Sequence, residues 1–438
     1  SIRYGELDPE ATLAFCSRNA AIQLRLEDRL GTLTKGKEGT ISVFDGHPAS
    51  TYSRCLMTLA RGRALFVRDP QRDSIWEDYG DAARTFADSI RVEGDADEVP
   101  VKKPGPRPEA FEAWTRGGKG SSFLVRGATV HPISSAPFQG GILVRDGRIV
   151  WMGPDGEAPA GEANTVVDAE GRHLYPGFVN GCDRTGIFEV GSVRGSRDDR
   201  ETGKDHPDLS IASAIHGDSW HHPVTRGNGV AYVLVRPSQG RIRGQAALIQ
   251  LDGEVSPDFV VVPDLGLHIA FPGAKSPKDG KSPEEPKEVT ELDDWFDRAL
   301  EYEEIEQTFK AAGKAFLDHD PRLEALIPYA KGEKPVLLET DSAFSLMAAR
   351  DWAARRNLQT VYLGAKDGWK IAGYLGADRA RIITGPVHGL PGGENDPYDS
   401  PFRNASILSA AGCRVGLRTN DPEVTRNLPF QAATAAAE

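Results

Sequence analysis

The chain has 438 residues, with 52 Lys and Arg against 64 Asp and Glu and a net charge of −12. An acidic chain is not expected to bind nucleic acid generally, and no run approaches the ~20 apolar residues of a membrane span. Apolar residues make up 39% of the chain, enough for one large domain or two to three smaller ones.

The first segment predicts helix and then strands. Residues 7–30 carry two helical patterns, and Asp8 before Pro9 is typical of a helix start because proline fits the first helical position. Gly31 follows the last apolar residue of this stretch and is expected to end the second helix. Residues 33–46 and 54–69 hold Val-, Phe- and Leu-rich runs bounded by Gly and Asp, which predict strands around turns. The polar, Pro- and Gly-rich residues 71–120 predict a linker or crossing segment.

A second set of strands begins at Phe123. The turns at Asp146-Gly147 and Glu170-Gly171 stand between alternating apolar positions and predict hairpins. After Pro176, apolar runs alternate with helical stretches such as 287–316 and 342–356, which predicts a parallel sheet covered by helices. Six or more such units over ~260 residues favour a closed barrel. The expected strands are 229–235, 267–271, 335–340, 359–363, 381–385 and 413–419.

Residues 168–198, DAEGRHLYPGFVNGCDRTGIFEVGSVRGSRD, and the hairpin-rich segment before them resemble the amidohydrolase superfamily, in particular its imidazolonepropionase-like and dihydroorotase-like members. Residues 7–48 resemble the C-terminal end of that family, and 418–438 resemble the segment around its eighth strand. The resemblance implies an α/β fold, a (β/α)8 TIM-type barrel with a small composite β-sandwich. It also implies a hydrolase of non-peptide carbon–nitrogen bonds that activates water with one or two divalent metals, usually zinc.

The order of these segments is unusual, because a family C-terminus precedes a family N-terminus. We interpret residues 1–70 as the C-terminal helix and sandwich strands of one copy, joined by 71–120 to a second copy. Residues 121–175 are then its N-terminal sandwich strands, and 176–438 its barrel, truncated before its own tail. A circular permutation is the alternative, since Glu438 would run into Ser1 almost without a seam. Either way, residues 33–69 are expected to pack with 121–175.

The resemblance places the family's metal-ligand positions on residues of other kinds: Cys182 and Arg184 in the first strand, Glu339 or Thr340 in the fifth, Gly364 in the sixth, and Asn420, followed by Asp421, in the eighth. Cys182 keeps a soft donor, but a guanidinium has no lone pair to offer a cation. Asn420 is an amide and cannot take the proton of an attacking water. We therefore expect no catalytic metal in this copy, and an arginine that stands in for the cation's charge against Glu339 in a salt-bridged, closed pocket.

Histidine and cysteine each leave two interpretations open. His206, His216, His221 and His222 could form a relocated metal site, or belong to a polar loop whose histidines make hydrogen bonds. Adjacent histidines of an extended chain point in different directions, which favours the loop. Cys182 could be a nucleophile or a packed core thiol. The four cysteines are widely spaced and form no CxxC pair, so neither a disulfide scaffold nor a zinc knuckle is expected.

Three residues are candidates for a substrate pocket. His388 stands in the loop after the seventh strand, and Arg236 and Arg241 stand in the Gly-containing segment 236–245, where they and Arg243 could hold an anionic substrate. The alternative for these arginines, and for Arg194, Arg197 and Arg200, is pairing with the nearby Asp198, Asp199 and Glu201.

Two functions of different class follow. In the first, the whole protein is a metal-dependent amidohydrolase whose working site lies outside this copy. In the second, this copy is a non-catalytic barrel that buttresses or regulates a partner copy, or binds a small molecule. Both imply a small-molecule ligand and a second amidohydrolase copy or homo-oligomer as partner, and neither implies nucleic acid or a membrane.

Overall fold

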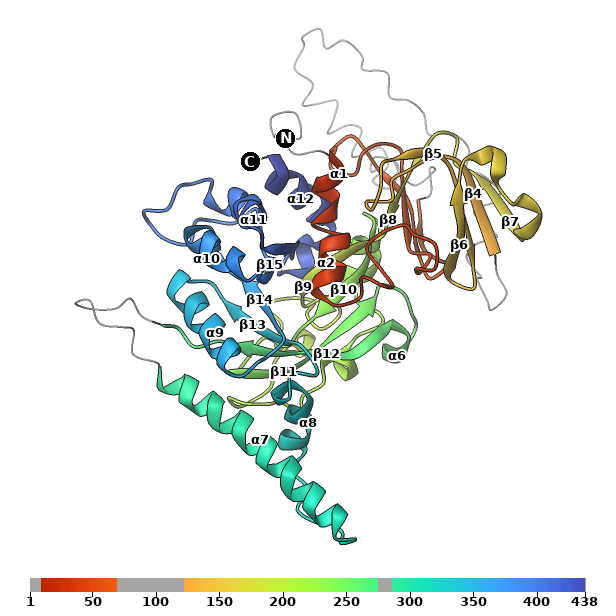
Figure 1. Ribbon diagram of the computed structural model, residues 1–438. Coiled ribbons are helices and arrows are strands. Elements are labelled where there is room, and N and C mark those ends of the chain that lie inside the picture. The colour runs from red at the N-terminus through yellow and green to blue at the C-terminus, as the bar shows by residue number, and fades with distance from the viewer. Residues whose placement is uncertain (1–8, 69–121, 275–285, 438) are drawn as a thin grey trace.

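The computed structural model describes residues 9–68, 122–274 and 286–437, which form two eight-stranded sheets with helices packed mainly on the second (Figure 1). The fold is therefore of the mixed α/β class. The predicted linker 71–120 lies outside the described residues, as does Asp8. None of the helices described is long and apolar enough to cross a membrane.

The first sheet joins two segments that lie far apart in the sequence. β1 pairs antiparallel with β8, with Ile41 opposite Pro176, so the expected packing of 33–69 against 121–175 is observed. Leu59 and Val125, one from each segment, lie in the same apolar core. The strands are β1 (Ile41–Phe44), β2 (Cys55–Ala60), β3 (Arg63–Val67), β4 (Ser122–Val130), β5 (Phe138–Arg145), β6 (Arg148–Gly153), β7 (Thr165–Asp168) and β8 (His173–Pro176).

One of the two predicted hairpins is confirmed. Asp146 and Gly147 have φ of 49° and 78°, as a type I′ turn requires, and they join the antiparallel strands β5 and β6. The second hairpin is wrong. Glu170 and Gly171 also have positive φ, but β7 and β8 each pair with β4, in parallel, and not with one another. The turn lets the chain leave β4 and return to it, with Gly171 N donating to the Gly127 carbonyl at 2.7 Å.

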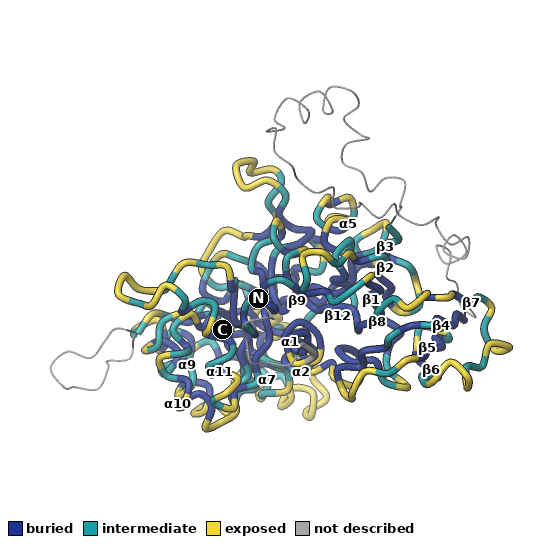
Figure 2. The backbone as a smooth tube through the Cα atoms, turned by 90° about the horizontal axis from the view of Figure 1, so that it is seen from above, coloured by how far each residue is buried: buried dark blue, intermediate teal, exposed yellow. Residues whose placement is uncertain are grey.

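The second sheet is nearly closed and holds most of the buried core (Figure 2). Its strands follow chain order from β9 to β16, and all pairs are parallel except those of β11, which is antiparallel to both neighbours. β11 was missed, because its first half, IRGQ, interrupts the apolar run and reads as loop. The strands are β9 (Phe178–Asp183), β10 (Val230–Val235), β11 (Ile242–Gln250), β12 (Val260–Ala270), β13 (Val336–Thr340), β14 (Thr360–Gly364), β15 (Arg381–Thr384) and β16 (Arg414–Leu417).

The backbone that links the first two helices bridges the first and last strands of this sheet. Leu417 N in β16 donates to the Phe15 carbonyl at 3.2 Å, and Val179 N in β9 donates to the Cys16 carbonyl at 2.8 Å. α1 and α12 lie side by side next to this bridge (Figure 1). Residues from the two ends of the described chain therefore complete one folded body.

Within the predicted helical stretch 7–30 the helices α1 and α2 form, but residues 24–31 are turns and bends, so Gly31 ends no helix and that part of the prediction is wrong. The other two stretches differ only at their ends: 287–316 is helical to Ala311, and 342–356 begins at Ala343. The long α7 pairs with α8 and reaches away from the sheets (Figure 1). The helices are α1 (Pro9–Ala14), α2 (Arg18–Gln23), α5 (His221–Arg226), α6 (Ser256–Phe259), α7 (Lys287–Ala311), α8 (Pro321–Ala330), α9 (Ala343–Arg355), α10 (Ala372–Ala377), α11 (Ser400–Ala410) and α12 (Leu428–Ala437).

Candidate functional site

Five polar side chains meet at one edge of the second sheet, where the parallel strands end. Glu339 lies near the end of β13, His268 near the end of β12, and Arg236 and Arg418 directly follow β10 and β16. Arg243 comes from the start of β11, which reaches the same edge because that strand runs in the opposite direction. We call these five residues the Glu339 cluster.

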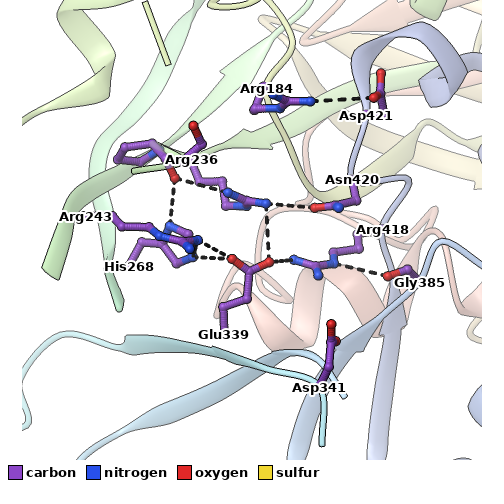
Figure 3. Close-up of polar contacts among 12 residues, drawn as sticks. Arg184, Arg236, Arg243, His268, Glu339, Asp341, Gly385, Arg418, Asn420 and Asp421 are labelled. Carbon is purple, nitrogen blue, oxygen red and sulfur yellow. Dashed lines mark hydrogen bonds and ion pairs between the residues drawn. The ribbon is translucent and has the colours of Figure 1, made fainter. Parts of the chain in front are cut away.

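Both carboxylate oxygens of Glu339 accept hydrogen bonds from arginines (Figure 3). Oε1 accepts from Arg418 Nη1 at 2.7 Å and from Arg236 Nη2 at 3.3 Å. Oε2 accepts from Arg243 Nη1 and lies 3.2 Å from His268 Nε2. Burial by itself raises the pKa of Glu339, but the charges of Arg418 and Arg236 outweigh it, so the pKa lies below its usual range and the group is a carboxylate.

His268 is neutral in this cluster. It is fully buried, and burial, together with Arg243 and Arg236, lowers its pKa to about 3 despite the nearby Glu339. Its Nδ1 lies 2.9 Å from the Pro237 carbonyl, which assigns the ring proton to Nδ1. Nε2 then presents a lone pair to Arg243 Nη1 at 3.4 Å.

The cluster carries more positive than negative charge. Three guanidiniums face one carboxylate and a neutral imidazole, which leaves two positive charges in excess among these five side chains. Arg236 and Arg418 are 7% and 3% exposed, so solvent screens them little. Asn420 Oδ1 accepts from Arg236 Nη2 at 2.8 Å, and the half-exposed Asp341 is the next carboxylate to act on Arg418.

The donor set does not fit a divalent cation. Arg418 Nη2 lies 3.1 Å from where a Cβ of Gly364 would stand, so a guanidinium fills the space that a ligating side chain at this residue would need. Asn420, which follows β16, accepts a hydrogen bond from Arg236. Cys182 is fully buried, and burial raises the pKa of its thiol, which disfavours the thiolate that would act as ligand or nucleophile. Across residues 9–68, 122–274 and 286–437, no group of three or more His, Cys, Asp or Glu side chains is placed to hold a metal.

Arginines do pair with Glu339, as expected, but Arg184 is not one of them. Arg184 lies 3.2 Å from Asp199 and 3.5 Å from Asp421, and its guanidinium stacks on the Phe188 ring at 4.0 Å. Successive residues of a strand point to opposite sides, and it is the preceding Asp183 that turns into the protein.

Arg184 belongs instead to a second, outer group, which we call the Asp199 cluster: Arg184, Arg197, Asp199 and Arg200. Asp199 is fully buried, with Arg197 at 3.6 Å, Arg200 at 3.4 Å and the Ser238 hydroxyl at 2.6 Å. This is the loop-stabilising alternative considered for these arginines. Arg241 behaves likewise, since it binds Asp205 and Glu291, each at 2.6 Å. Of the two arginine candidates, only Arg236 reaches the Glu339 cluster.

Asp183 was not singled out from the sequence, although it ties the first strand to the last. Its carboxylate accepts from Asn180 at 2.8 Å, from the Thr185 amide at 2.8 Å and from the Thr425 hydroxyl. Asn180 in turn accepts from the Thr419 amide at 3.1 Å. Burial raises the pKa of Asp183 above its usual value, and the hydrogen bonds from Thr425 and Thr185 offset only part of that rise.

The histidine candidates do not converge on one site. His216 binds Asp198, His222 Nε2 lies 2.9 Å from the His216 carbonyl, and His221 lies 3.8 Å from Glu189. Burial lowers the pKa of His222 to about 4, so it is a neutral core group. His388 is exposed and pairs with the Thr434 hydroxyl at 2.9 Å. The loop interpretation therefore describes these residues better than a metal site.

Comparisons with known proteins give short sequence matches and one similar fold. No family model matches the chain. It is 45% identical over 56 residues to an imidazolonepropionase of Acidiphilium cryptum, covering 11% of this chain and 14% of that protein. It is 43% identical over 58 residues to a 5-methylthioadenosine/S-adenosylhomocysteine deaminase of Desulforudis audaxviator, covering 13% and 14%. It is 35% identical over 71 residues to an adenine deaminase of Rubrobacter xylanophilus, covering 16% and 12%.

The matches thus span only about a seventh of these relatives' length. The crystal structure of an amidohydrolase from Thermotoga maritima aligns over 72% of this chain and 82% of its own, with a TM-score of 0.62 and 22% identity. That likeness concerns the fold. By short stretches of sequence and by fold together, the chain is a relative of the amidohydrolase superfamily.

Proposed function

We propose that this chain is the non-hydrolytic barrel of a carbon–nitrogen hydrolase of the amidohydrolase type, in which arginines replace the metal. The Glu339 cluster carries the proposal, because three guanidiniums and one carboxylate stand at the end of the barrel where the family activates water. In this assignment the hydrolysis of a small non-peptide substrate belongs to a second amidohydrolase copy, which this barrel buttresses or regulates.

Electrostatics supports the absence of a hydrolytic metal. A dication ~4 Å from one guanidinium is disfavoured by about 8 kcal/mol at an effective dielectric of ~20, before the other two are counted. The two oxygens of Glu339 that would bind the cation already accept hydrogen bonds from arginines. Asn420, where the family has its proton acceptor, cannot serve as a general base.

The fold is assigned in more detail as part of the same proposal. The second sheet is a (β/α)8-type barrel in which β11 has become antiparallel, and the first sheet is the small β-sandwich beside it. Residues 9–68 supply strands to the sandwich and the bridge between β9 and β16. The tandem order with a linker at 71–120, and its alternative of circular permutation, both stay predictions.

Metal analysis of the purified chain tests the proposal directly. After dialysis against chelator we expect less than one zinc, manganese or nickel per chain, and no hydrolysis of imidazolonepropionate, methylthioadenosine or adenine. Asn420→Asp is the matched variant, since it restores the family's carboxylate but leaves the arginines, and it should remain metal-free and inactive. A stoichiometric metal that is lost on His268→Ala, or turnover by the unmodified chain, would overturn the proposal.

A further inference from the structure

A second basic site lies at the opposite edge of the barrel sheet, where the parallel strands begin. A cleft of about 410 Å³ opens there, lined by Thr360, Arg381 and Arg414, which are the first residues of β14, β15 and β16. The Glu339 cluster stands at the other ends of the strands, so the two sites are separate. We call this site the basic cleft.

The strand register places two arginines side by side in the basic cleft. Arg381 and Arg414 are direct partners in the parallel pairing of β15 and β16. Partners on neighbouring strands lie about 4.8 Å apart and project on the same side of the sheet. Like charges in this arrangement repel and destabilise the pair.

The cleft has few carboxylates to offset these charges. Arg350 and Arg379 also line it, and the charge of Arg350 is taken by Asp378. Within the part of the chain that the structure describes, no carboxylate oxygen lies within 4.0 Å of a guanidinium nitrogen of Arg379, Arg381 or Arg414. Burial, Arg25 and Arg414 lower the pKa of Arg381, and only Glu27 acts against them.

The shape and chemistry of the basic cleft match a phosphorylated ligand. Its volume lies within the ~300–1,000 Å³ of small-molecule sites, and its lining also includes the apolar Ala353, Leu358 and Ala380 and the ring of Tyr362. Forked guanidinium donors suit phosphate oxygens, and a polyanion would supply the missing negative charge. We propose that the basic cleft binds a small molecule that carries phosphate groups. This inference does not depend on the function proposed above.

Calorimetry and thermal unfolding of the full chain with pyrophosphate, at physiological salt, test the inference. Pyrophosphate should bind and raise Tm, and Arg381→Gln and Arg414→Gln should each weaken binding about tenfold, since a hydrogen bond to a charged group contributes ~1.5–3 kcal/mol. Arg298→Gln is the matched control. It removes an exposed arginine of α7 whose acidic partner, Asp294, lies 3.8 Å away, and it should leave binding unchanged.

The unliganded variants separate a ligand site from a structural one. Because each substitution removes a repelling charge, Tm without ligand should stay level or rise for Arg381→Gln and Arg414→Gln, while the effect of pyrophosphate shrinks. Tighter binding of ADP than of pyrophosphate would indicate that the nucleoside also contacts the apolar lining of the cleft. Equal binding would limit recognition to the phosphates. Both outcomes support the inference. Binding of neither anion, equal binding by both glutamine variants and the unmodified chain, or a lower unliganded Tm in both variants would overturn it.

Discussion

The Glu339 and Asp199 clusters have the same composition at their centres, one carboxylate among three arginines, but they are built on different supports. The arginines around Glu339 stand on or next to strands and are 3–18% exposed. Those around Asp199 belong largely to a loop and are 17–45% exposed. A strand end fixes a guanidinium where it cannot turn to water, whereas a loop lets it do so. The inner cluster should therefore respond far more strongly to the loss of its carboxylate.

Removing the inner carboxylate should have the largest effect. Glu339→Gln leaves three poorly hydrated guanidiniums without a counter-charge, and we expect the free energy of unfolding to fall by about 3–5 kcal/mol. Denaturant unfolding measures this, with Glu333→Gln as the control, because Glu333 is 57% exposed and its ion pair with Lys331 contributes little. A loss below that of the outer cluster's carboxylate would contradict the comparison.

Acid should distinguish the clusters next, because only the inner one contains a histidine. The pKa of His268 is lowered to about 3 in the folded protein, so between pH ~6.5 and ~3 the unfolded state binds more protons. The free energy of unfolding is therefore unaffected by the titration of His268 above pH ~6.5. Below that it falls as pH decreases, by up to ~1.4 kcal/mol per pH unit. Below pH ~4.5 the unfolded chain also protonates Glu339, whereas the folded protein keeps it ionised because its pKa is lowered there, and this adds to the loss of stability.

Stability measured across this range should show a shallower slope in His268→Gln than in the unmodified chain. His222, with its pKa lowered to about 4, contributes in the same direction and supplies the slope that remains. An unchanged slope in His268→Gln would remove the inner cluster from the account of acid sensitivity.

Filling the space next to Arg418 should lower the free energy of unfolding by less than the loss of Glu339 does. Gly364 has φ of +91°, and an added Cβ would lie 2.4 Å from Asp341 Oδ1 and 3.1 Å from Arg418 Nη2. Asp341 can turn toward solvent but Arg418 cannot, so Gly364→Ala should destabilise by about 1–3 kcal/mol. Gly36→Ala is the matched control, since Gly36 has nearly the same φ, +93°, and nothing lies within 4 Å of its Cβ position. Urea unfolding compares the two, and equal midpoints would show that the space beside Arg418 is not constrained.

The smallest effect is expected in the outer cluster. Asp199→Asn should destabilise by about 1 kcal/mol, because its arginines can rehydrate, and high salt should reduce that difference. The same salt series should leave the effect of Glu339→Gln nearly constant. A salt-independent Asp199→Asn effect as large as that of Glu339→Gln would make the two clusters equivalent.

Local patterns predicted the elements better than the site. Apolar runs with helical stretches between them located six strands of the second sheet, and the Asp146-Gly147 turn located one hairpin, because these signals depend on neighbouring residues. β11 was missed because its start is polar and its pairing is antiparallel. Arg243 was considered as part of an anion-binding loop but not as a partner of Glu339. Arg418 was not named at all, because nothing nearby in sequence distinguishes it.

The sequence by itself determined which positions lack a ligand: Gly364 has no side chain, and Asn420 has no acid to act as base, wherever they lie. Only the tertiary structure decided what stands there instead. Glu339 forms ion pairs with Arg236, Arg243 and Arg418, which lie 79 to 103 residues from it in the sequence, and none with Arg184. Strand order, direction and register set those distances, and they result from the packing of the whole sheet, which no local pattern encodes.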